Sequence, residues 1–296
     1  MGLFKKKQDK VFKQDLSQKE GESHLFFMWL LFDQEPQRPD ADTVHKKLEQ
    51  KFGAIHTIME DEKMSSYALP KYMSEFADNA KLPTQVVMGD IHSFDQDKIS
   101  EFERGQIWDC PDGKELLDHI THRVMLWDMM DTLDFMQKSE MLMDWLETAL
   151  DLYKECVAVW IPSAGKLIMA DDIRSQSYRR EDRFLHYCVN ARFFTVNGSD
   201  DMIVDTRGMY AMGLPDVQCH FHGIDPNDVV YYVYNIAMYI FKNRMPIEDG
   251  DTIDGLQDGE LVPEIQWKCQ YEDSLVQPLR PVIDICPGEF AAGTRV

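Results

Sequence analysis

The chain has 296 residues, of which 44% are hydrophobic and 11% aromatic, and its formal net charge is −21. The length exceeds one average domain, and the hydrophobic content is enough to fill a sizeable core. A negative charge of this size repels phosphate backbones and anionic membranes, so we expect no nucleic acid and no membrane as partners. A basic protein is the partner that it would attract.

Six cysteines are scattered singly along the chain, and no two of them form a CxxC pair. This usage is typical of reduced, half-buried cysteines in a cytosolic protein. The N-terminal residues lack the apolar stretch of a secretory signal, and the longest apolar run, near residues 25–32, is too short to span a bilayer. We therefore expect a cytoplasmic protein.

Residues 1–22 are rich in Lys and Gln and have no periodicity, which predicts a disordered basic tail. Residues 24–32, HLFFMWLLF, are typical of a central strand that is covered on both faces. An amphipathic helix should follow, because three apolar residues share one face and both ends have capping residues. The face consists of Val44, Leu48 and Phe52, the N-cap candidates are Asp40, Asp42 and Thr43, and Gly53 is the C-terminal stop.

The pattern then predicts three strands and a second, shorter helix. The strands are at residues 54–61, 65–69 and 84–92. Pro70 suits the first turn of the short helix, which would carry its apolar side chains on one side. Those side chains are Tyr72, Met73, Phe76 and Ala77.

A similar arrangement recurs in the middle of the chain. Residues 121–130 are predicted as a strand, although their methionines also suit a helix. A long amphipathic helix follows, and residues 155–162 and 166–170 form a hairpin around the turn at 163–165. The apolar stripe of the helix consists of Phe135, Leu142, Leu146, Ala149 and Tyr153.

A third unit begins with a strand at 188–196, and Asn197-Gly198 is the strongest hairpin signal in the chain. Further strands are predicted at 202–206 and 217–223. Asp225-Pro226 caps an apolar and largely buried helix at 227–243. A late strand is predicted at 264–271, within an acidic segment.

Together these elements predict an α+β protein, in which two α/β sandwich-type modules have mixed, mainly antiparallel sheets with helices packed on them. We place an N-terminal module at 23–110 and a C-terminal module at 111–256. An acidic C-terminal extension would occupy 257–296.

Two histidines on the predicted strand 217–223 are candidate zinc ligands. His220 and His222 are two residues apart, so they point to the same face, and Asp216 could add an oxygen ligand. The same alternation also describes an ordinary half-buried strand with its histidines outward, and we favour that interpretation. No other cofactor is predicted, and we assign no catalytic residue.

Arg192 and Arg207 stand in apolar surroundings and need acidic partners if they are buried. Each could form a structural ion pair or bind an anionic ligand, and we favour the ion pair. Nearby, Thr206 is expected to cap a short helix. The methionines clustered in residues 124–146 indicate either core filling or a pliable binding surface.

Several segments of the C-terminal half form a fairly specific set of motifs. They are the Arg-Phe-Phe strand, the Thr-Arg-Gly-Met and Gly-Leu-Pro-Asp segments, and the apolar helix that leads to Asp-Gly-Asp-Thr. They lie at residues 192–194, 206–209, 213–216, 227–243 and 249–252. Through them, residues 189–255 resemble the bacterial family known as domain of unknown function 4261. The resemblance implies no activity and no catalytic residues. Its relatives are similar to immunity and accessory proteins of bacterial toxin systems, which implies a protein-binding role.

The standard linear motifs of hydrolases, nucleotide-binding proteins and zinc proteases do not occur in this sequence. The sequence therefore favours a non-enzymatic protein-binding module with a basic partner. One alternative is a metal-dependent hydrolase that uses His220 and His222 with nearby acids. The other is a structural, self-associating protein, and the oligomeric state is left open.

Overall fold

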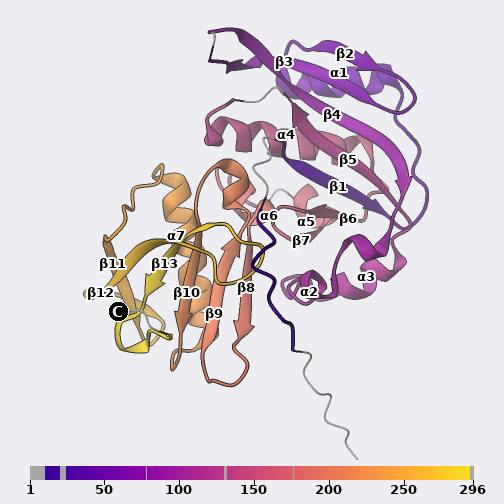
Figure 1. Ribbon diagram of the computed structural model, residues 1–296. Coiled ribbons are helices and arrows are strands. Elements are labelled where there is room, and N and C mark those ends of the chain that lie inside the picture. The colour runs from indigo at the N-terminus through magenta and orange to yellow at the C-terminus, as the bar shows by residue number, and fades with distance from the viewer. Residues whose placement is uncertain (1–10, 21–24, 78, 130–131, 176, 294–296) are drawn as a thin grey trace, which may run out of the picture.

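The computed structural model describes residues 11–20, 25–77, 79–129, 132–175 and 177–293, which form two β-sheets with helices packed against them. Figure 1 shows the sheets side by side, the first in indigo to pink and the second in orange and yellow. The first sheet has seven antiparallel strands, and the second has six strands with one parallel pair. The predicted α+β class is confirmed.

The first sheet has the strand order β2-β3-β4-β5-β1-β6-β7. Its strands are β1 (Phe27–Phe32), β2 (His56–Glu60), β3 (Ser65–Glu75), β4 (Lys81–Ser93), β5 (His122–Met129), β6 (Ala158–Ile161) and β7 (Lys166–Met169). Its helices are α1 (Ala41–Phe52), α2 (Glu101–Arg104), α3 (Gly113–His119), α4 (Phe135–Leu152), α5 (Ala170–Arg174) and α6 (Arg183–Cys188).

The aromatic and aliphatic run of β1 is covered on both faces, as predicted. Leu30 lies in the main hydrophobic cluster with residues of α1 and α4. Leu31, on the opposite face, lies in a smaller cluster with Leu117 of α3. Successive residues of a strand point to opposite faces of the sheet. Because Leu30 and Leu31 are both 0% exposed, both faces of β1 must be covered.

The second sheet has the strand order β11-β12-β13-β10-β9-β8. Its strands are β8 (Asn190–Thr195), β9 (Met202–Arg207), β10 (Asp216–Phe221), β11 (Thr252–Gln257), β12 (Glu260–Asp273) and β13 (Pro281–Cys286), and its helix is α7 (Pro226–Lys242). Asp225 caps α7 by accepting from the backbone N–H of Asn227 at 2.9 Å, and Pro226 is the first helical residue. This predicted helix start is confirmed.

The second sheet has one apolar face and one polar face. Val217, Cys219 and Phe221 of β10 are all 0% exposed and belong to the apolar cluster that includes α7. Asp216 and Gln218 are also 0% exposed, but they point to the other face because side chains alternate along a strand. A buried polar face requires partners for each of its groups.

The helix predicted to begin at Pro70 is wrong, because β3 continues to Glu75. The pairing of β3 with β4 shifts register between Leu69 and Met73, and this irregularity takes in Pro70. Proline lacks the N–H that a regular ladder needs, so a bulge is a place where a strand can contain it. Tyr72 and Ser74 are buried and alternate with exposed neighbours, which is the period of a strand.

The predicted boundary between residues 110 and 111 does not coincide with the division between the sheets. β1 pairs with β5 on one side and with β6 on the other, so the first sheet reaches residue 169. The segment 257–296, predicted as an acidic extension, supplies β12 and β13 to the second sheet. β13 pairs in parallel with β10 and is buried over Val282–Cys286. Pairing between distant segments leaves no local mark in the sequence.

The basic tail predicted for residues 1–22 lies partly outside the described residues. Its described part, residues 11–20, contacts the loop before β13: Glu20 N–H donates to the carbonyl of Leu279 at 2.9 Å, and Leu279 N–H donates to Gln18 at 2.7 Å. All six cysteines are buried with free thiols. No helix in the described ranges has the length and apolar character needed to cross a membrane.

Candidate functional site

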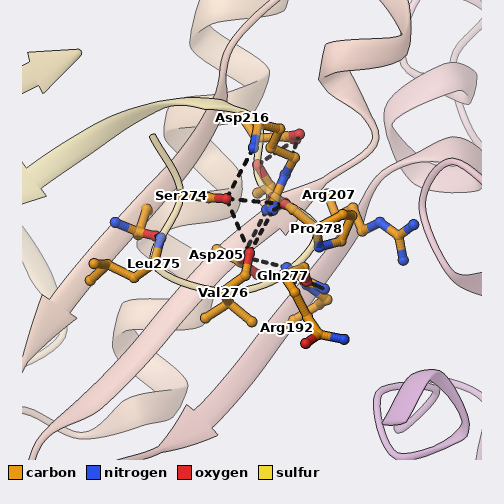
Figure 2. A network of polar contacts seen from close by, with 12 residues as sticks. Arg192, Asp205, Arg207, Asp216, Ser274, Leu275, Val276, Gln277 and Pro278 are labelled. Carbon is orange, nitrogen blue, oxygen red and sulfur yellow. Dashed lines mark hydrogen bonds and ion pairs between the residues drawn. The ribbon is translucent and has the colours of Figure 1, made fainter. Parts of the chain in front are cut away.

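Four charged side chains meet on the polar face of the second sheet, beneath the loop of residues 274–280 (Figure 2). They are Arg192, Asp205, Asp216 and Arg280, and none is more than 2% exposed. We call them the buried ion network. Arg192 donates to both carboxylate oxygens of Asp205, at 2.8 Å from Nε and 2.6 Å from Nη2. The two residues face each other across β8 and β9, so strand register sets this pairing.

Arg280, just before β13, connects the two aspartates. Its Nε donates to Asp216 at 3.0 Å, and its Nη2 donates to Asp205 at 2.7 Å. The other donors bind the backbone carbonyls of Thr206, Val276 and Pro278. All five N–H groups of the guanidinium are used, so no donor is left for a ligand.

The formal charges of the buried ion network balance, with two guanidinium groups against two carboxylates, although burial raises the pKa of Asp216 and lowers the pKa of Arg192. Burial alone would raise the pKa of Asp205, but Arg192 and Arg280 together hold it below its ordinary value. Burial would lower the pKa of Arg280, whereas Asp205 and Asp216 raise it above the ordinary value. Both groups are therefore charged at neutral pH, and the network joins three strands as a structural unit.

A second set of hydrogen bonds fixes the 274–280 loop over the network. Ser274 Oγ donates to the carbonyls of Val276 and Pro278, and it accepts from the backbone N–H of Arg280 at 3.2 Å. Gln218 of β10 accepts from Leu275 N–H at 2.7 Å and donates to Asp284 of β13 at 2.8 Å. The polar face is thus closed by its own loop.

The three candidate zinc ligands are not brought together. Asp216 and His220 lie four residues apart on one strand, roughly 13 Å at the usual strand rise. Asp216 is occupied by Arg280, whereas His220 Nε2 lies 3.7 Å from a carboxylate oxygen of Asp201. His222 follows the end of β10, and its backbone N–H donates to Phe290. Within the described ranges, no group of three or more His, Cys, Asp or Glu side chains could hold a metal ion.

His220 lies on the face opposite Cys219 and Phe221, as predicted, but its side chain is only 12% exposed because other residues cover that face. It shares the polar face with Asp216 and Gln218 and lies close to Gly293. The alternation along the strand correctly predicted that Cys219 and Phe221 point to the opposite face. It did not show that the C-terminal residues return to cover this face.

Both arginines singled out from the sequence contact acidic groups of the protein. Arg192 belongs to the buried ion network. Arg207 donates to Glu20 at 3.0 Å from Nε and to Glu103 at 3.3 Å from Nη1, and its Nη2 donates to the carbonyl of Pro162 at 3.3 Å. Arg207 thereby ties the N-terminal segment and the first-sheet unit to β9.

Thr206 was predicted to cap a short helix, and this prediction is wrong. Thr206 instead joins β9 to β10. Its hydroxyl donates to Asp216 at 3.0 Å and accepts from Val217 N–H at 2.9 Å. The 3-10 helix at Met209–Met212 starts after Gly208, and Asp216 rather than Thr206 accepts from its first backbone N–H groups, those of Gly208 at 3.3 Å and Met209 at 3.1 Å. The Thr-Arg-Gly segment is therefore a connection that aligns two strands beside the buried ion network.

A concave surface of the part of the chain that forms the second sheet lies between α7 and the β11–β12 hairpin. This groove of about 590 Å³ has a tyrosine-rich floor, and neither Lys nor Arg is among its lining residues. Its most accessible large side chains are Tyr231 at 72%, Tyr239 at 46% and Leu261 at 56% exposure. Tyr232 fixes one wall by donating from its hydroxyl to the carbonyl of Asp254 at 2.7 Å. We call it the tyrosine groove.

Acidic residues border the tyrosine groove. Asp228 and Asp254 line it directly. Asp258 and Glu260 flank Gly259 at the hairpin tip, which packs so closely on α7 that a Cβ there would lie 3.2 Å from the Asp228 carboxylate. We call these four residues the acidic rim. Overall, residues 246–273 contain nine acidic residues and one basic residue.

The sequence carried a partial signal for this surface. The apolar helix at 227–243 and the acidic segment after it were both predicted. The groove itself could not be predicted, because no strand was predicted at β11 and the hairpin tip with Gly259 and Leu261 was assigned to an extension. Two methionines of the 124–146 cluster, Met141 and Met143 of α4, are 0% and 1% exposed and belong to the core, whereas Met129 of β5 is 37% exposed.

Comparisons with curated proteins and with solved structures gave no match. A family model described as Domain of unknown function (DUF4261) matches residues 205–286. The matched segment runs from Asp205 to the end of β13 and includes three of the four residues of the buried ion network. It also extends past the predicted region of resemblance, 189–255, into the segment that had been assigned to an extension. The C-terminal part of this chain, residues 205–286, is therefore a DUF4261 domain.

Proposed function

We propose that this chain is a non-enzymatic, cytoplasmic protein-binding module that binds a basic partner protein through the tyrosine groove. The observation that carries the proposal is the groove itself, which combines accessible aromatic and aliphatic side chains with acidic and no basic lining residues. Tyrosines are enriched among the residues that dominate binding energy at protein interfaces. The acidic rim selects the charge of the partner.

The distribution of charge supports this choice of partner. Among the described residues, the buried charged side chains nearly cancel, with five basic and six acidic groups. These are Lys138, Arg183, Arg192, Arg207 and Arg280 against Asp128, Asp144, Asp182, Asp205, Asp216 and Asp284. The net charge of −21 therefore lies almost wholly on the exterior, where it accelerates encounters with a basic protein.

The use of the chain's polar groups also favours binding over catalysis. The densest cluster of charged residues in the DUF4261 domain is inaccessible, and its arginine donors are bound to protein acceptors. An immunity or accessory protein of a toxin system, which the family resemblance implies, needs a surface of this type for a basic toxin domain. The proposal requires no cofactor.

Fluorescence anisotropy with labelled helical peptides tests the proposal. The first peptide contains lysines and leucines in an amphipathic pattern, the second replaces each lysine by glutamate, and the third contains lysines but no leucine. We expect the first to bind best, because it alone matches both the acidic rim and the apolar floor. No measurable binding of the first peptide, or equal binding of the first and second, would contradict the function.

A matched pair of variants locates the binding surface. Leu261→Ser removes an accessible leucine of the tyrosine groove, and Leu82→Ser removes one of comparable exposure from β4 of the first sheet. Loss of one interface leucine should weaken binding by about tenfold. We expect that loss for Leu261→Ser only. Equal affinities for the two variants would show that the peptide binds elsewhere.

A further inference from the structure

A second concave surface lies where the edge strand β7 of the first sheet approaches α7 and the edge strand β8 of the second sheet. This cleft has a volume of about 380 Å³, within the range of small-ligand sites. Its walls come from the loop before α3, from β7, from residues 172–187 and from α7. Both units of the fold contribute, so the cleft exists only when the two sheets are assembled. We call it the aromatic cleft.

Aromatic rings form much of the wall of this cleft. Trp108 and Tyr178 line it with 51% and 43% of their surface exposed, so part of each ring is free to contact a ligand. Tyr178 stacks on His186 with ring centroids 3.7 Å apart, and Tyr234 Oη lies 3.3 Å from His186 Nδ1. These contacts hold the rings of Tyr178 and Tyr234 in place before a ligand arrives. Preformed aromatic faces attract organic cations through their quadrupoles.

The charges that line the cleft favour a cation over an anion. Lys166 is its one lysine, and this ammonium is bound to Asp109 at 2.9 Å and to the carbonyl of Val189 at 3.1 Å. The carboxylate of Asp172 also lines the cleft, and it has no ion pair with any described residue. The unbalanced formal charge of the lining is therefore negative.

The neighbouring titratable groups are consistent with this negative potential. Burial raises the pKa of Cys110, and the nearby carboxylates of Asp109, Asp172 and Asp112 raise it further. Burial lowers the pKa of His186 below its ordinary value, so its ring is neutral at pH 7 and adds no positive charge.

From this geometry we propose that the aromatic cleft binds a quaternary ammonium group, held by the faces of Trp108 and Tyr178 and by the carboxylate of Asp172. A methylated ammonium suits these walls, because it is weakly hydrated and needs no hydrogen-bond acceptors. The group could belong to a free small molecule or to a trimethylated lysine side chain. The cleft shares Tyr231 with the tyrosine groove, yet its ligand is separate from the peptide proposed there.

Ligand-observed NMR with the full chain tests this assignment. Choline is compared with 3,3-dimethyl-1-butanol, which has the same shape but carbon in place of the charged nitrogen. Cation–π attraction predicts that choline binds saturably and about tenfold more tightly than the neutral analogue. Equal affinities, or no binding of choline at millimolar concentration, would overturn the proposal. The third ligand tested is N-acetyl-trimethyllysine methylamide. Whichever of this compound and choline binds more tightly identifies the source of the cation.

Variants then locate the site. Trp108→Ala and Asp172→Asn change exposed residues, and each should weaken choline binding at least threefold. Tyr239→Ala is the matched control, because Tyr239 lines the tyrosine groove but not the aromatic cleft. Choline affinities that are unchanged in both cleft variants would overturn the assignment. If choline fails while basic peptides still bind, only this inference fails; if only the peptides fail, the proposed function falls and this site stands.

Discussion

Arg280 shows at the scale of one residue how this protein uses its buried charge. Its guanidinium donates to two buried aspartates and three backbone carbonyls. Two of those carbonyls belong to the 274–280 loop, so the side chain also holds the loop against the sheet. A hydrophobic side chain of similar length would fill the space, but each of these acceptors would lose a donor and the two aspartates would lose their shared cation.

We therefore predict that Arg280→Met destabilises the protein by about 3–5 kcal/mol, because it removes one partner of a buried ion network and leaves Asp216, whose pKa burial already raises, without its cation. Arg244→Met is the matched control. Arg244 pairs with Asp134 at 2.7 Å, but its side chain is 60% exposed, and an exposed pair contributes at most about 1 kcal/mol. Urea unfolding followed by circular dichroism measures both free energies. A loss below 1 kcal/mol for Arg280→Met would contradict the structural role of the network.

Part of the buried ion network could be predicted from the sequence. Arg192 and Arg207 stood out because a charged residue in apolar surroundings needs a partner, and both do contact carboxylates. Asp216 was considered as a metal ligand, since its position beside two histidines was the only visible context. Arg280 had no signal at all, because Pro and acidic residues around it resembled a solvated tail. Its partners are 64 and 75 residues away in sequence.

At the scale of elements, the connection from β9 to β10 is the most constrained part of the DUF4261 domain. Gly208 has φ of 137°, and a Cβ on it would overlap the backbone carbonyl oxygen of Cys188. This close approach lets β9 end beside the C-terminus of α6. Gly213, at the other end of the 3-10 helix, also has a positive φ of 73°, but an added Cβ would meet open space.

The two glycines give a matched prediction. Gly213→Ala should cost roughly 1 kcal/mol, which is the penalty of a left-handed conformation for a residue with a side chain. Gly208→Ala should cost more than about 3 kcal/mol, because backbone strain is combined with a clash against a carbonyl that cannot rotate away. Thermal and urea unfolding of both variants checks the order. Equal losses would mean that the turn can move away from Cys188.

Local signals predicted most elements of the fold, and they failed where pairing depends on distant segments. The Asn197-Gly198 turn joins β8 to β9, and Asp225-Pro226 starts α7, since both motifs act through their own backbone geometry. Pro70 was misinterpreted because a proline beside apolar residues suits a helix start as well as a strand bulge. The long hairpin strand β12 has mostly exposed or half-buried side chains, so its composition resembles an acidic loop.

For the whole molecule, the central question is whether the large negative charge acts generally or through the acidic rim. A general effect depends only on net charge and is screened by salt over a distance of about 8–10 Å. A local effect depends on where the carboxylates lie relative to Tyr231, Tyr239 and Leu261. The two can be separated because the chain has exposed acids far outside the DUF4261 domain.

Two variants distinguish the general effect from the local one. One variant changes the acidic rim, the control changes acids elsewhere, and both change the net charge by three units. The rim variant is Asp228→Asn, Asp258→Asn and Glu260→Gln; the control is Asp33→Asn, Glu35→Gln and Glu62→Gln, at exposed positions in the first-sheet unit. We expect the rim variant to bind the lysine-leucine peptide at least tenfold more weakly and with less salt dependence, since close charges contribute most to affinity. The control should lose no more than about twofold, mainly in association rate. Stopped-flow anisotropy at several salt concentrations measures both, and equal losses would mean that the negative exterior attracts basic partners without a defined rim.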